Sequence, residues 1–184
     1  KYGADEEITI MHKPHIGTDV LREVIKHFRK DLEASGIKFY FNTRVDNILI
    51  EGGCAKAIIV DGKPIYYDKI ILAIGNAARD TFKNLISDGL HLNAKPFAIG
   101  FRIEHLQTFV DKSQFKDYAG HPRLFKGEYS LACDGVYSFC MCPGGIVVPS
   151  SSEPEHLCVN GMSYHNRGLR NANSAIVTTI NDYK

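Results

Sequence analysis

Two cysteines, Cys140 and Cys142, stand one residue apart just ahead of Pro-Gly-Gly, and thiols can act as redox groups, nucleophiles or metal ligands. In an extended strand such residues lie on one face, roughly 6.6 Å apart, which is the far limit for a disulfide. We therefore expect two reduced thiols on the same face of a sheet. Two other interpretations stay open: buried cysteines that pack as small apolar side chains, and a zinc site shared with Cys133 and Cys158. The zinc interpretation lacks a Cys-x2-Cys pair, and we expect no metal.

An unbroken apolar run from Ile70 to Ile74 ends at Gly75. Five apolar residues are too few for a helix, and the β-branched content predicts a central strand buried on both faces, with parallel neighbours. A glycine at its end lets a ligand approach the backbone, and Asn76 can cap a helix that begins at Ala77. This arrangement is typical of a nucleotide site. The alternative is an ordinary strand-to-helix corner without a ligand.

Two polar segments could also bind a ligand. Residues 13–18 precede a helix, so Gly17 and the helix N-terminus could hold an anion or a cofactor edge; the alternative is a loop with a good N-cap and a solvated histidine. Residues 160–167 and 171–174 gather amides, a hydroxyl, a histidine and arginines, which suits a polar ligand and a surface loop equally well. The sequence carries no glycine fingerprint, Walker loop, His-Glu-x-x-His motif or nucleophile elbow, so it predicts no complete nucleotide or hydrolase site.

The elements that must position these residues follow from periodicity and turn signals. Thr18 can cap a helix whose apolar residues follow helical spacing and which ends at Gly36. We expect a strand over 37–41, a three-stranded meander over 45–67 with turns at 52–53 and 61–62, the buried strand 70–74 and a helix over 77–87.

The second half of the chain predicts an antiparallel domain. Strand 97–103 is followed by an irregular polar stretch over 106–127 and by a hairpin whose strands, 129–133 and 136–142, flank Asp134-Gly135. A type II turn at 143–144 then leads to a strand over 146–148. A loop over 150–155 precedes strands at 156–162 and 176–180. The fold class expected is α/β plus antiparallel β.

Composition bounds the function classes. With 184 residues, 44% of them hydrophobic, the chain can form one sizeable core or two modest domains. A net charge of +1 without a lysine or arginine run argues against nucleic acid or a membrane surface as a partner. An odd number of cysteines, no long apolar span and no leader segment predict a cytoplasmic protein.

Five segments in order, residues 13–21, 71–80, 95–105, 135–145 and 160–165, carry a resemblance over nearly the whole chain. The chain resembles a family of uncharacterised bacterial FAD-dependent dehydrogenases of the glutathione-reductase-like flavoprotein type. Members of that family open with a glycine-fingerprint unit and close with a glycine-rich segment, which implies that this chain is a middle fragment. The resemblance implies that residues 1–94 form the second part of the FAD domain, 95–172 an inserted substrate domain and 173–184 a return segment.

The resemblance also implies site residues. The cofactor side would comprise His15, Gly17, Thr18, Val45, Ala73, Ile74 and Gly75. On the substrate side we select Cys142 and His165 as candidate catalytic residues, Gly144, and Arg102 as an anion partner. The expected function is that of a fragment of an FAD-dependent oxidoreductase acting on a small molecule. We expect the fragment itself to carry no FAD and to self-associate through its exposed cofactor wall. The alternatives are a zinc- or thiol-dependent regulatory module and a non-enzymatic domain whose sheet binds a partner protein.

Overall fold

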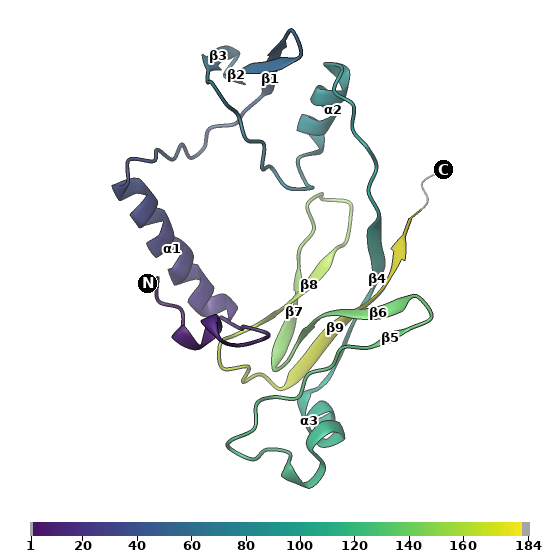
Figure 1. Ribbon diagram of the computed structural model, residues 1–184. Coiled ribbons are helices and arrows are strands. Elements are labelled where there is room, and N and C mark those ends of the chain that lie inside the picture. The colour runs from purple at the N-terminus through teal and green to yellow at the C-terminus, as the bar shows by residue number, and fades with distance from the viewer. Residues whose placement is uncertain (1, 182–184) are drawn as a thin grey trace. The chain divides into compact units, whose positions relative to one another are not determined.

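The computed structural model describes residues 2–181 and divides the chain into two compact units (Figure 1). The larger unit combines the chain up to Ile37 with the chain from Lys95 onward, and the smaller unit comprises Lys38–Ala94. The resemblance assigns functional domains to residues 1–94, 95–172 and 173–184, and these assignments stay predictions.

The smaller unit is built on the predicted meander. Its elements are β1 (Asn47–Glu51), β2 (Cys54–Val60), β3 (Lys63–Tyr66) and α2 (Arg79–Ser87). The strands pair antiparallel in the order β1-β2-β3. Both tight turns adopt positive φ, 58° and 76° at Gly52 and Gly53 and 50° and 71° at Asp61 and Gly62, as their glycines predicted. The meander prediction is confirmed.

The predicted central strand over 70–74 is wrong. These residues form no strand, and Ile71 is 92% exposed. A central strand needs hydrogen-bonding neighbours on both sides, and the three strands described for this unit pair only with one another. The cap prediction also fails, because α2 begins at Arg79 with Ala78 as N-cap and no side-chain cap. Residues 37–41 form no strand either.

The larger unit contains an antiparallel sheet in the order β4-β9-β6-β5. Its strands are β4 (Phe97–Leu106), β5 (Ala132–Cys133), β6 (Val136–Cys142) and β9 (Asn171–Ile180). β4 and β9 pair without interruption, from Phe97 opposite Ile180 to Leu106 opposite Asn171. The hairpin at Asp134-Gly135 joins β5 to β6 as predicted. A second, two-stranded sheet pairs β7 (Gly145–Pro149) with β8 (Val159–Ser163).

One part of this unit differs from the sequence prediction. The stretch predicted as irregular contains α3 (Gln107–Phe115) and a 3-10 turn, η2 (Lys116–Tyr118). Gln107 is only 2% exposed, and its side chain donates to the Asp111 carboxylate at 2.8 Å and to the Gly127 carbonyl at 2.9 Å. This long-range anchoring has no local sequence signal. A turn is present at 143–144 as predicted, and the strand that follows it, β7, pairs with β8 and not with β6.

Strand β6 contains a β-bulge at Cys140. Cys140 has φ 52°, and the pairing with β9 skips from Phe139 to Cys142. The extra residue breaks the two-residue alternation. Cys140 is exposed and Cys142 is buried, both thiols are free, and their side chains interact, so the prediction that they share one face stays a prediction.

The N-terminal part of the larger unit consists of a 3-10 turn, η1 (Glu6–Thr9), and α1 (Thr18–Ala34). Helix α1 begins after Gly17, not after a Thr18 cap, and Gly36 follows its end with φ 90°. No residue of α1 is fully buried. Within residues 2–181, every helix is too short or too polar to cross a bilayer.

Candidate functional site

The N-terminus of α1 packs directly onto the segment that follows β8. The Thr18 hydroxyl donates to the Ser163 carbonyl at 3.2 Å, and the backbone N–H of His165 donates to the Asp19 carboxylate at 2.8 Å. A Cβ at Gly17 would lie 2.2 Å from the backbone nitrogen of His165, so the two segments of the chain are in close contact at this glycine. We call residues 15–19 and 163–165 the junction. The junction joins two segments that sequence analysis singled out separately.

The rings of the two junction histidines both contact backbone carbonyl oxygens. Nε2 of His15 lies 3.0 Å from the carbonyl oxygen of Tyr164, and Nδ1 of His165 lies 2.9 Å from that of Ile16. Their rings are nearly parallel, at 12°, with centroids 6.4 Å apart. Each ring is thus held by the backbone next to the other histidine.

The negative charge at the N-terminus of α1 comes from a side chain of the protein itself, the Asp19 carboxylate. The hydrogen bond from the backbone N–H of His165 lowers the pKa of the Asp19 carboxyl below its ordinary value of 3.8. The backbone N–H groups of Val20 and Asp19 lower this pKa by smaller amounts. The carboxylate therefore accepts the hydrogen bonds that an external anion would take. Binding of a cofactor anion at this N-terminus stays a prediction.

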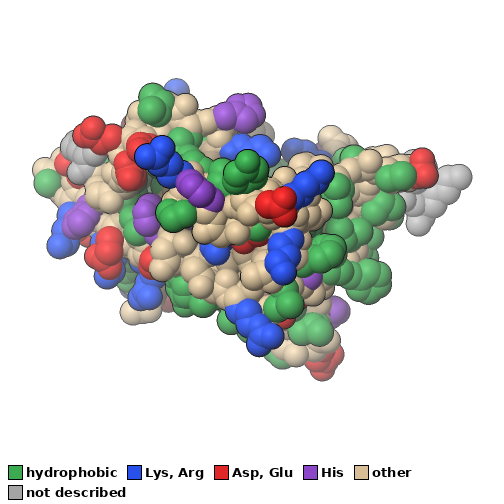
Figure 2. Space-filling view, turned by 90° about the horizontal axis from the view of Figure 1, so that it is seen from below, with side chains coloured by type: hydrophobic (Ala, Val, Ile, Leu, Met, Phe, Trp, Pro, Cys, Tyr) green, Lys and Arg blue, Asp and Glu red, His purple; other side chains and the backbone are tan. Residues whose placement is uncertain are grey.

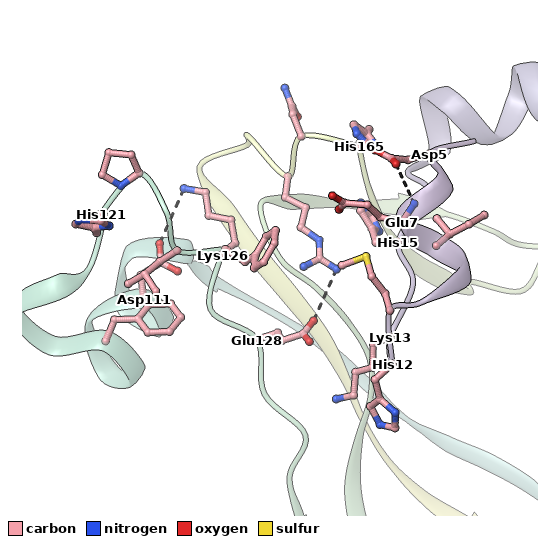
Figure 3. Close-up of a pocket in the computed structure, with 18 of the residues that line it drawn as sticks. Asp5, Glu7, His12, Lys13, His15, Asp111, His121, Lys126, Glu128 and His165 are labelled. Carbon is pink, nitrogen blue, oxygen red and sulfur yellow. Dashed lines mark hydrogen bonds and ion pairs between the residues drawn. The ribbon is translucent and has the colours of Figure 1, made fainter. Parts of the chain in front are cut away.

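A pocket of about 710 Å³ opens beside the junction in the larger unit. It is lined by residues of segments 5–15, 111–128 and 165–167. Figure 3 shows Asp5, Glu7 and His15 on the N-terminal side of this pocket and Asp111 and His121 on the opposite side. We call it the histidine pocket, because four histidines line it: His12, His15, His121 and His165.

The histidine pocket mixes both signs of charge. The cations Lys13, Lys126 and Arg167 and the carboxylates Asp5, Glu7, Asp111 and Glu128 line it. The ion pairs among them are long, 4.0 Å from Lys126 to Asp111 and 3.7 Å from Arg167 to Glu128. The face seen in Figure 2 likewise carries histidines and charged side chains of both signs among hydrophobic ones.

A second polar cluster surrounds Arg102. Its Nη1 donates to the Cys140 carbonyl at 3.2 Å and to the Asn173 side-chain oxygen at 2.8 Å, and its Nη2 donates to Asn160 at 3.3 Å. A Cβ at Gly161 would lie 2.9 Å from the Cys142 sulfur and 2.4 Å from Nη1 of Arg102, so glycine leaves room for the cluster. Arg102 thus ties its own strand to three others, and the bulge residue is one of its partners.

Cys142 lies in this cluster as a buried thiol. Burial raises the pKa of the Cys142 thiol, the neighbouring Cys140 raises it further, and Arg102 opposes both. A group held as a neutral thiol is a poor nucleophile.

We therefore predict that Cys142 is alkylated by iodoacetamide about tenfold more slowly, or more, than Cys140. Burial lowers the thiolate fraction of Cys142 and blocks the reagent, whereas Cys140 is exposed two residues away and serves as the internal control. Mass spectrometry of the labelled chain over time measures both rates. Equal rates would show that Cys142 is accessible and reactive.

Gly144 has a packing role in the structure. Its N–H donates to the buried Gln107 side chain at 2.8 Å, and its φ is 47°. A Cβ there would lie 1.7 Å from the Arg167 carbonyl oxygen. A substrate contact at Gly144 stays a prediction.

The remaining cofactor candidates, Val45, Ala73, Ile74 and Gly75, lie in the smaller unit. Ile74 is 37% exposed, and Gly75 has φ 71° with no atom within 4 Å of the position that a Cβ would take. The backbone at Gly75 is therefore uncovered. Within the larger unit, the structure brings His15, Gly17 and Thr18 to His165, and Arg102 to Cys142.

Several residues of these sites escaped sequence analysis. Asn160 and Asn173 belong to the polar segments noted above, but no local signal pairs them with Arg102. The pocket residues of segment 111–128 carried no motif at all. Among residues 2–181, no three His, Cys, Asp or Glu side chains gather as ligands for a metal.

The chain is similar in sequence to a known protein family and to an uncharacterized bacterial protein. Residues 96–184 match a protein-family model described as FAD-dependent protein, C-terminal domain-like. An uncharacterized protein of Clostridium beijerinckii is 43% identical over 192 aligned residues, which cover 100% of this chain and 36% of the relative. The chain thus spans about a third of the length of that relative. The match supports an FAD-dependent family, while the glutathione-reductase-like type stays a prediction.

Proposed function

We propose that this chain is part of an FAD-dependent oxidoreductase that transfers hydride or electrons to or from a small-molecule substrate. The structural observation that carries the proposal is the junction, where segment 15–19, assigned to the cofactor side, meets His165, assigned to the substrate side. The family match of residues 96–184 supports FAD as the cofactor of the longer protein. A cytoplasmic location and a small-molecule partner belong to the same proposal.

We propose that residues of the smaller unit form one wall of a flavin site. The uncovered backbone at Gly75, with Ala73 and Ile74 before it, would accept a cofactor edge in close approach. FAD supplies the hydride or electron acceptor, and the protein supplies orientation and electrostatics. Around the substrate, His165 is exposed at the histidine pocket, whereas Cys142 is buried in the Arg102 cluster. We therefore favour His165 over Cys142 as the residue that contacts substrate.

The test uses the longer protein of which this chain is proposed to be a part. We expect it to purify with the absorption spectrum of bound flavin, and we expect Gly75→Val to reduce its FAD content severalfold or more, because the branched side chain displaces the cofactor edge. Gly52→Val is the matched control, since Gly52 also has positive φ, 58°, and open space at its Cβ position. Unchanged FAD content in Gly75→Val, or equal loss in both variants, would count against the assignment.

One observation favours a second candidate, a protein-interaction role. Phe97, Ile99, Phe101 and Ile103 occupy alternate positions of β4 and are all exposed, Phe101 by 83%. Such an apolar row on one sheet face is typical of a surface that contacts another protein segment. Binding of a partner protein through this sheet remains a prediction, and self-association through the exposed cofactor wall is a separate one.

A further inference from the structure

We infer that the histidine pocket binds a small molecule that donates hydrogen bonds, an alcohol or an amine, and that Nε2 of His165 takes up its proton. The proton-transfer part of this inference rests on the proposed function. The binding part rests on the geometry of the junction.

The backbone fixes the tautomers of both histidines. A carbonyl oxygen only accepts, so the ring nitrogens that face carbonyls must carry hydrogen: Nε2 of His15 toward Tyr164, and Nδ1 of His165 toward Ile16. In the neutral rings, the opposite nitrogens, Nδ1 of His15 and Nε2 of His165, are then left as lone-pair acceptors. Neither has a hydrogen-bond partner among residues 2–181.

These acceptors belong to residues that border one pocket. Both histidines line it, and His165 is exposed, so a small molecule can reach its ring. The carboxylates of Glu7 and Glu128 line the same pocket and add acceptors. In their neutral forms, two imidazole acceptors with nearby carboxylates suit a ligand that brings hydroxyl or amine hydrogens.

The same arrangement gives His165 a chemical role in oxidation. Oxidation of an alcohol or amine removes a hydride from carbon, which the bound flavin would accept, and a proton from oxygen or nitrogen. The electron pair of the broken O–H or N–H bond forms the new C=O or C=N bond. Nε2 of His165 accepts the proton, while the bond from Nδ1–H to Ile16 holds the ring in place.

The tautomers can be tested on the chain itself by long-range ¹H–¹⁵N correlation spectroscopy at about pH 8, where histidine side chains are normally neutral. We expect His165 as the Nδ1–H form and His15 as the Nε2–H form. His121 is the matched control from the same pocket, because its Nδ1 accepts from the Arg123 N–H at 3.2 Å and it should be the Nε2–H form. Single His→Gln variants at the three positions assign the signals. An Nε2–H signal for His165 would overturn the inference.

Ligand binding can be tested with a defined probe, 2-aminoethanol, which carries both donor groups. We expect it to shift the Nε2 signal of His165 saturably and to leave the signals of His27, which lies outside the pocket lining, unchanged. The donor-free analogue 1,2-dimethoxyethane should cause no such shift. Equal shifts with both compounds, or none with either, would refute the donor-binding role. Absence of flavin from the longer protein, with both results intact, would instead refute only the oxidoreductase proposal and the proton step that rests on it.

Discussion

Purified as the 184-residue chain, the protein is expected to hold no FAD and to bind added FAD about a thousandfold more weakly than the longer protein. Tight binding in dinucleotide folds places the diphosphate at the N-terminus of the first helix after a glycine fingerprint. This sequence carries no such fingerprint, and the N-terminus of α1 is already neutralised by Asp19. Loss of about 4 kcal/mol of contacts corresponds to that factor, since each 1.4 kcal/mol is tenfold.

Titration of the purified chain with FAD, followed by flavin fluorescence, measures this directly. The longer protein, stripped of its cofactor and titrated in the same way, is the control. Saturable submicromolar binding to the chain would mean that its own residues form a complete site, and that Gly75 and its neighbours do more than line one wall.

The elements that sequence predicted well are those with a local cause. The meander follows from two glycine turns, the β5–β6 hairpin from Asp134-Gly135, and α1 from its helical apolar spacing. Apart from the helix caps, the failures discussed here depend on distant residues. An apolar run such as 70–74 becomes a strand only if neighbouring strands are present, and α3 depends on the contact of Gln107 with Gly127. The bulge at Cys140 depends on its register with β9.

The candidate site likewise has residues that local sequence selects and contacts that only the fold creates. Gly17 and His165 were each selected from local composition, but their contact spans a sequence separation that no local pattern encodes. The Arg102 cluster likewise combines four strands, β4, β6, β8 and β9, and the partners Asn160 and Asn173 become apparent only once β8 and β9 are placed. Sequence therefore identified segments, and the fold determined which of them meet.

The junction itself predicts a large loss of stability for Gly17→Ala. A Cβ at this position would lie 2.2 Å from the backbone nitrogen and 2.4 Å from the Cα of His165, and backbone atoms cannot move aside as a flexible side chain can. The residue also has φ 88°, which is unfavourable for alanine. We expect the larger unit to lose about 3 kcal/mol or more, because the start of α1 must separate from residues 163–165.

Gly36→Ala isolates the contribution of contact from that of backbone strain. Gly36 follows the other end of α1 with φ 90°, and its Cβ position has no atom within 4 Å. We expect this control to cost about 1 kcal/mol, from φ alone. Urea unfolding curves of the two variants and the unchanged chain give the free energies, and the His165 ring signals report whether the junction has opened. If Gly17→Ala and Gly36→Ala lose equal stability, the junction does not require the close approach of backbone to backbone, and the segments of His15 and His165 are held together by their side chains instead.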